Sequence, residues 1–113
     1  MTKTEAPNAA RGERSLTIGG ETVIVCATMD GMARLSAALG FPPLGEMLRR
    51  LTGGEINAVR GAIEHLAIRG DGAAAALAAT MTDILEATPT ITDALLAHIG
   101  DDKPGKPDAG TTT

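Results

Sequence analysis

Aromatic side chains are nearly absent from this chain, because Phe41 is the one aromatic among 113 residues. One aromatic residue cannot form the surfaces on which nucleic-acid bases stack, nor the aromatic belts of membrane interfaces. Cys26 is the one cysteine, which excludes an intramolecular disulfide and gives no reason to expect an oxidising compartment. No stretch approaches the ~18 apolar residues of a membrane span, and the first residues lack the apolar core of a signal peptide. We expect a cytoplasmic protein.

Lysine is missing from residues 13–100, which carry six arginines against ten carboxylates, a net charge of −4. This balance argues against a nucleic-acid binder, whose affinity comes largely from basic side chains that neutralise phosphates. Large apolar side chains are almost missing from residues 1–12 and 101–113, so these segments cannot bury enough surface to offset the entropy of ordering. We expect two disordered tails at 1–12 and 101–113 and a single domain over 13–100.

The clearest local pattern is a β-hairpin over residues 13–26. Gly19 and Gly20 separate two β-prone runs, RSLTI and ETVIVC, and a two-residue turn needs the positive φ that glycine adopts at no steric cost. This turn places Ile18 opposite Glu21 and Arg14 opposite Val25, and the alternation of side chains then defines two faces. The apolar face holds Leu16, Ile18, Val23 and Val25. The other face holds Glu13, Ser15, Thr17 and Thr22, with Ile24 and Cys26 as apolar exceptions.

Apolar residues at three- and four-residue spacing predict helices at about 29–39, 43–52, 55–69, 72–87 and 90–99. Thr28 fits the N-cap of the first helix and Gly40 its end, Pro43 can begin the second, and Pro89 separates the last two. Gly61 lies inside the third predicted helix and lowers its stability by ~1 kcal/mol relative to Ala. This indicates either that another backbone approaches closely there or that the fold simply tolerates a glycine at this position. A hairpin followed by four to five short helices predicts an α+β fold with the helices packed on one face of a two-stranded antiparallel sheet.

Groups for catalysis are sparse. Nucleophilic chemistry needs a nucleophile, a base and an orienting group, and the candidates are Cys26, His65 and His98. We interpret Cys26 as a small strand residue and both histidines as surface or boundary residues. The two histidines and one cysteine do not form a metal-ligand cluster, and the glycine pairs lack the Lys-Ser/Thr of a phosphate-binding loop. We therefore expect no enzyme activity, no cofactor and no metal.

The second and third predicted helices could also be drawn as a helix-turn-helix around Gly53 and Gly54. The would-be recognition helix begins Glu55-Ile56-Asn57, with a carboxylate where phosphate contacts need a donor. A small DNA-binding regulator is therefore the weakest of the binding hypotheses.

Methionine gives the best indication of a binding surface. Met29, Met32, Met47 and Met81 fall on apolar helix faces, and methionine adapts to irregular partners. The alternative is that they fill a core that has few aromatics. Ile24 on the polar hairpin face and the free strand edges add a second candidate surface. The residues that we expect to contact a partner are Thr17, Thr22, Ile24, Met29, Met32 and Met47.

The order of elements also carries a family resemblance over about residues 13–100. The hairpin and capped helix (LTIGGETVIVCATMDGMARLSAALG), the Leu-rich helix (LGEMLRRL), the TGGE break and the helix AIEHLAIRGDG resemble small phage tail-assembly proteins. The likeness is to a protein family that is found in gene transfer agents and related prophages. Its members are described as tail-assembly chaperones and are sometimes labelled tail tube proteins. The family has no motif tight enough to assign binding residues position by position.

The resemblance implies a non-enzymatic role in the bacterial cytoplasm. Such a chaperone would bind the long, hydrophobic tape measure protein, and could meet the tail tube protein, before the tube polymerises; it would be absent from the mature particle. The alternative is a structural minor tail or tail tube component that stays in the particle. Neither reading involves nucleic acid or membrane, and self-association through the hairpin edge or the methionine-lined helices stays open.

Overall fold

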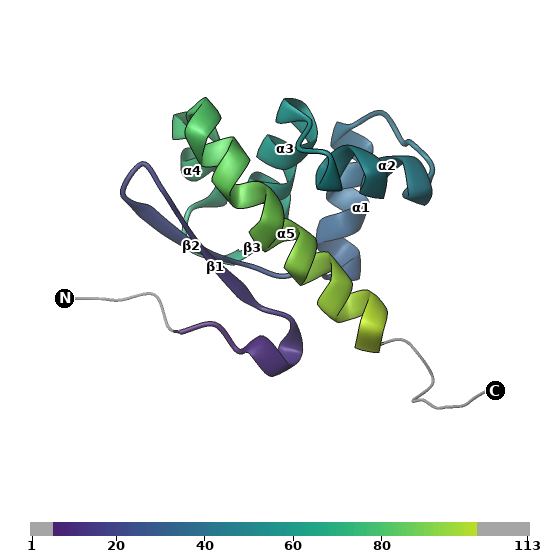
Figure 1. The fold of residues 1–113 in the computed structure, drawn as a ribbon, viewed down its shortest axis with the longest axis horizontal. Coiled ribbons are helices and arrows are strands. Elements are labelled where there is room, and N and C mark those ends of the chain that lie inside the picture. Colours follow the sequence, from purple (N-terminus) through teal and green to yellow (C-terminus); the bar gives the residue numbers. More distant parts are fainter. Residues whose placement is uncertain (1–5, 102–113) are drawn as a thin grey trace.

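The computed structural model of the chain describes residues 6–101, and Figure 1 shows its helices gathered on one side of a small sheet. The elements in chain order are the 3-10 helix η1 (Ala9–Arg11), strands β1 (Arg14–Ile18) and β2 (Glu21–Val25), helices α1 (Met29–Ala38), α2 (Leu44–Thr52) and α3 (Ile56–Leu66), strand β3 (Ala67–Arg69), and helices α4 (Gly72–Ala78) and α5 (Met81–Asp101). The α+β class is confirmed. The sheet has three strands, one more than expected, in the order β1-β2-β3.

The hairpin forms in the predicted register. Ile18 pairs with Glu21 and Arg14 with Val25. Gly19 and Gly20 have φ of 58° and 82°, the pair of positive values that a type I′ turn requires. The predicted apolar face enters the core, where Val23 and Val25 are fully buried.

The third strand corrects the predicted helix 55–69, which ends at Leu66. Ala67 pairs with Val25 and Arg69 with Ile24, and the backbone N–H of Cys26 donates to the Leu66 carbonyl at 2.9 Å. β2 is therefore the central strand, and its run from residue 23 to 27 is buried throughout. Pairing with β2 outweighs the helix propensity of the three residues of β3.

α3 is the central helix of the core. It buries one apolar side, formed by Ala58, Val59, Ala62, Ile63 and Leu66. Gly61 faces α1: a Cβ added there would lie 2.8 Å from the Leu35 Cδ1. The neighbour is the end of a leucine side chain, so the structure shows no close backbone approach at this glycine.

The C-terminal region differs from the prediction of helices at 72–87 and 90–99. α4 ends at Ala78, and α5 begins with a reciprocal cap in which the Thr80 Oγ1 accepts the Asp83 N–H (3.1 Å) and the Asp83 Oδ2 accepts the Thr80 N–H (3.0 Å). Pro89 lies inside α5. The helix continues because its buried stripe keeps one spacing across the proline, while Pro89 itself is exposed. The stripe consists of Ile84, Ala87, Ile91, Ala94 and Leu95.

The expected disorder of residues 1–12 is wrong for the part next to β1. The Asn8 side chain accepts the Ala10 N–H at 3.1 Å as the N-cap of η1, and Gly12 ends the turn with φ 83°. Residues 1–5 and 102–113, also expected to be disordered, lie outside the described residues. Within residues 6–101, no helix is both long enough and apolar enough to cross a membrane.

Candidate functional site

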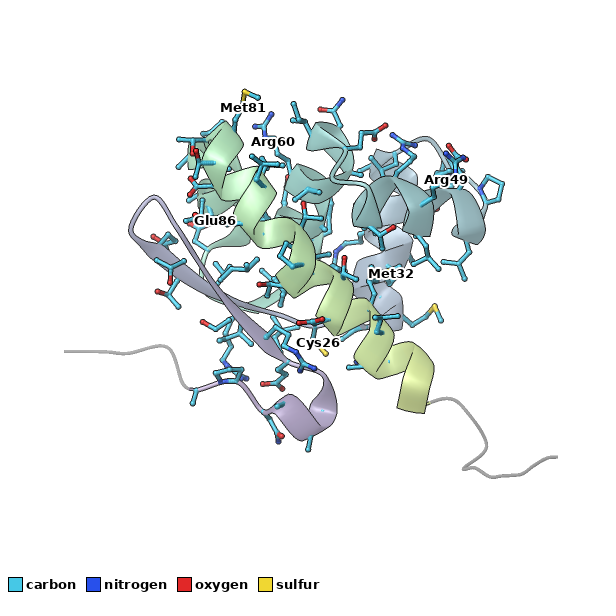
Figure 2. All side chains as sticks on the ribbon, viewed as in Figure 1. Cys26, Met32, Arg49, Arg60, Met81 and Glu86 are labelled. Atoms are coloured by element: carbon cyan, nitrogen blue, oxygen red, sulfur yellow. The ribbon has the colours of Figure 1, made fainter. Side chains whose placement is uncertain are left out.

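An apolar groove lies where α1, α2 and the C-terminal half of α5 meet. Two cavities of about 380 and 200 Å³ share the lining residues Met29, Met32 and Leu44, so they form one depression. The larger cavity is also lined by Ala27, Leu48, Leu95 and His98. We call the surface formed by Met29, Met32, Leu44 and Leu48 the methionine groove. Figure 2 labels Met32 where α1 passes beside α5.

The groove is open to solvent and rich in apolar surface. Met29 is 83% exposed and Leu44 60% exposed, whereas Met32 and Leu48 are half-buried and pack against the core. Scattered exposed apolar residues are ordinary, but several that line one depression are typical of a binding surface. Phe41, the only aromatic residue, is 75% exposed and directly precedes Pro42, which lines the smaller cavity.

The sequence positions this surface through the two ends of α1. The Thr28 Oγ1 accepts the Gly31 N–H at 3.0 Å and fixes the first turn, which carries Met29 and Met32. At the other end Gly40, with φ 87°, lets the Phe41 N–H donate to the Ser36 carbonyl at 2.8 Å. Phe41 has φ 60°, a left-handed conformation that is uncommon for an aromatic residue. The chain thus turns sharply before Pro42, and α1 and α2 line the smaller cavity together.

The structure brings together three of the six residues predicted to contact a partner. Met29 and Met32 line both cavities, and Met47, only 3% exposed, lines the smaller one from the core side. Thr17 and Thr22 lie away from the groove, on the outer face of the hairpin, with their Oγ1 atoms 3.3 Å apart.

The sixth predicted residue, Ile24, is not available to a partner. It is 1% exposed, so the expectation that it lies on an open face is wrong. Its cross-strand neighbours are Ser15 and Arg69, and β3, absent from the predicted sheet, pairs with β2 at this position. The added strand makes β2 the central strand, and Arg69 of β3, the partner of Ile24, forms an ion pair with Glu13.

Sequence reasoning missed Leu44 and Leu48 as parts of the surface. Leu44 and Leu48 belong to the predicted apolar stripe of α2, which the spacing alone places in the core. The proline break before Leu44 was the available signal. A residue in the first turn of a helix that follows such a break lies at the edge of the packed region, where one side of the side chain stays open.

Cys26 and His98, which we interpreted as a small strand residue and a surface or boundary residue, are in contact. The Cys26 Sγ lies 3.1 Å from the His98 Nε2, which joins the residue after β2 to the last described turns of α5. Burial, and then the negative charge of Glu13, raise the pKa of the Cys26 thiol. A reactive cysteine needs the opposite shift. The pair is therefore a hydrogen bond that anchors α5, and within the described residues no cluster of three metal-ligating side chains surrounds it.

The arginines of α1 and α2 do not form a basic surface. Arg34 pairs with Asp30, Arg49 with Glu46, and the Arg50 Nη2 lies 2.6 Å from the Glu55 Oε1. Glu55 also directly precedes α3, the would-be recognition helix. Each positive charge is thus matched by a carboxylate where a helix-turn-helix would contact phosphates.

Comparison with known proteins gives no relative: no protein-family model, no curated protein and no solved structure matches this chain.

Proposed function

We propose that this chain is a non-enzymatic, phage-type tail-assembly chaperone that holds an apolar segment of the tape measure protein in the methionine groove. The observation that supports this proposal most directly is the exposure of Met29 and Leu44 around one apolar depression. The resemblance of the sequence to tail-assembly proteins supplies the identity of the partner. A bacterial cytoplasm is the compartment in which such a chaperone works.

The chemistry of the groove suits a transient complex. Fully burying an exposed Met, Leu or Phe side chain stabilises a complex by ~1.5–3 kcal/mol, and association itself costs several kcal/mol. Met29 and Leu44, with the half-buried Met32 and Leu48, give a modest affinity. The long, unbranched methionines adapt to different apolar segments, as a chaperone for an extended hydrophobic protein requires. A complex of this strength can dissociate when the tail tube protein competes for the same partner.

The proposal is tested by co-expression with a tape measure protein of a gene transfer agent or related prophage. We expect the native chain to keep that protein in the soluble fraction. The double variant Met29→Lys/Leu44→Glu should fold normally, because both side chains are exposed, and should lose this effect. The matched control is Leu77→Lys/Leu85→Glu, which places the same charges at positions that are 80% and 71% exposed but lie outside the groove.

Equal protection by both double variants would contradict the role of the groove, and no protection by the native chain would contradict the chaperone function. Mass spectrometry of purified particles separates the chaperone from a structural tail component. We expect the chain to be absent from particles, and its presence at a fixed ratio to the tail tube protein would favour the structural alternative.

A further inference from the structure

The outer edge of β1 is an unpaired strand edge. The residues that flank a two-residue hairpin turn, here Ile18 and Glu21, are joined by hydrogen bonds, and bonded pairs alternate with non-bonded pairs along the ladder. Ser15 and Thr17 therefore direct their backbone N–H and C=O groups away from β2. In the part of the chain that the structure describes, neither backbone has a hydrogen-bond partner on that side.

One flank of α5 lies beside this edge. A cavity of about 180 Å³ separates β1 from α5, and Figure 2 shows Glu86 pointing into the region between the hairpin and the helix. The β1 side of the cavity is formed by residues 15–18. Its α5 side is formed mainly by Asp83, Glu86 and Thr90, which recur at the spacing of one helix face, and Asp93 continues that face.

The charge along this edge is mainly negative. Glu86 and Asp93 are exposed and form no ion pair within residues 6–98, while Asp83 is engaged only by the backbone N–H of Thr80. Arg14 adds one positive charge at the start of β1, where its guanidinium donates to the carbonyls of Ala9 and Glu13. The carboxylates on this flank of α5 thus lie along the free backbone N–H and C=O groups of Ser15 and Thr17 in β1.

We propose that this edge accepts an extended, Lys- or Arg-bearing segment of a partner protein as a fourth strand beside β1. The free N–H and C=O groups of Ser15 and Thr17 would bond the backbone of the added strand, as in other complexes formed by strand addition. The carboxylates of α5 would select basic side chains at alternate positions, since side chains on one face of a strand are two residues apart.

The charges also argue against two other occupants. A second copy that paired its own β1 antiparallel here would bring two acidic α5 flanks together across the two-fold axis, with like charges opposed. Nucleic acid would place phosphates against the same carboxylates. The inference does not depend on the methionine groove, which α1, α2 and the far end of α5 form.

The test uses the full chain and a peptide of alternating Lys and Thr that is long enough to span β1. We expect a Kd below about 1 mM, chemical shift changes at residues 15–18 and slower amide exchange at Ser15 and Thr17. A Glu-Thr peptide, and the Lys-Thr peptide N-methylated at alternate residues, should not bind. Glu86→Lys should weaken binding about fivefold, whereas Glu64→Lys, an exposed carboxylate on α3, should leave it unchanged.

Thr17→Pro removes one outward N–H without removing a bond to β2, so it should abolish binding while the circular dichroism spectrum is kept. If that variant does not fold, the N-methylated peptide makes the same test on the native chain. Absence of slower exchange at Ser15 and Thr17, or equal binding of the Glu-Thr peptide, would overturn the proposal. Sedimentation of the unliganded chain as a dimer that Thr17→Pro dissociates would overturn it in favour of a second copy.

Discussion

Glu13 and Arg69 lie 56 positions apart in the chain, and the Arg69 Nη2 donates to the Glu13 Oε1 at 2.6 Å. Because the strand order is β1-β2-β3, this ion pair connects the start of β1 with β3 across the central strand. The Glu13 side chain is 5% exposed and also accepts the backbone N–H of Asn8 at 2.9 Å. One carboxylate thus holds η1, β1 and β3 together.

The first prediction concerns the pH dependence of stability. The hydrogen bond from the Asn8 backbone, followed by Arg69, lowers the pKa of Glu13 against the opposing effect of burial. A depressed folded-state pKa contributes stability that is present above the unfolded-state pKa and is lost as pH falls through the folded-state value. Glu13→Gln should therefore unfold at lower denaturant concentration than the native chain at neutral pH, and the difference should shrink in acid.

Urea unfolding monitored by circular dichroism between neutral and acidic pH measures this effect. Glu64→Gln, at an exposed position on α3, controls for the loss of one negative charge. A difference between Glu13→Gln and the native chain that grew in acid would show that the ion pair does not stabilise the folded state.

The second prediction follows from the burial of Ile24. Ile24→Lys would place a charge at a position that is 1% exposed, so we expect a loss of more than ~3 kcal/mol of stability, enough to unfold a marginal domain. Ile24→Val, which removes one methyl group, should cost only ~0.5–1.5 kcal/mol. Unfolding curves of the two variants give the comparison. A folded Ile24→Lys protein with native stability would mean that this face of the sheet is open after all.

Ile24 also marks what the sequence could and could not reveal about the sheet. The register of β1 and β2 was predictable because two adjacent glycines fix the turn and the turn fixes every pair. β3 was not, because Ala67 to Arg69 continues a helical pattern and becomes a strand only through pairing with distant residues. The unbroken apolar run VIVCA was the available signal, since a central strand covered on both faces need not alternate.

The third prediction separates two glycines that the sequence alone cannot distinguish. A Cβ at Gly31 would lie 2.9 Å from the His65 carbonyl oxygen, a backbone atom that cannot move without shifting the end of α3. Gly31→Ala should therefore destabilise the chain by ~1–3 kcal/mol. Gly45 lies in α2 with no heavy atom within 4 Å of its added Cβ, so Gly45→Ala should stabilise by ~0.5–1 kcal/mol. Effects of the same sign in thermal unfolding would contradict the α1–α3 contact.

The candidate site was predictable only in part, for a related reason. Helical spacing identified Met29, Met32 and Met47 as members of apolar faces. Spacing shows only on which side of its own helix a residue lies, and does not show which other element packs against that side. How far another element covers that face is decided by the turn at Gly40 and by the length of α5. The reciprocal cap of Thr80 and Asp83, a Thr-x-x-Asp pattern in the printed sequence, could have shown that α5 begins well before Pro89.

The last prediction tests that continuous helix. Pro89 has no N–H to donate to the carbonyl of Leu85, and the loss is tolerated because both residues lie on the solvent side, where water can bond the carbonyl. Pro89→Ala restores a donor and removes the ring from the Leu85 carbonyl. We expect it to stabilise the chain by ~1–3 kcal/mol, more than the ~0.5 kcal/mol gain in helix propensity expected for Thr82→Ala, an exposed control in the same helix.

Hydrogen exchange of the new amide at position 89 provides a second readout, since it should be protected to the same degree as its neighbours in α5. Two helices that met at Pro89, as the sequence pattern predicted, would leave this amide in a connecting segment and exchanging rapidly. An unprotected amide together with unchanged stability would therefore show that α5 consists of two helices. It would also remove the basis for the single acidic flank that runs from Asp83 to Asp93 beside β1.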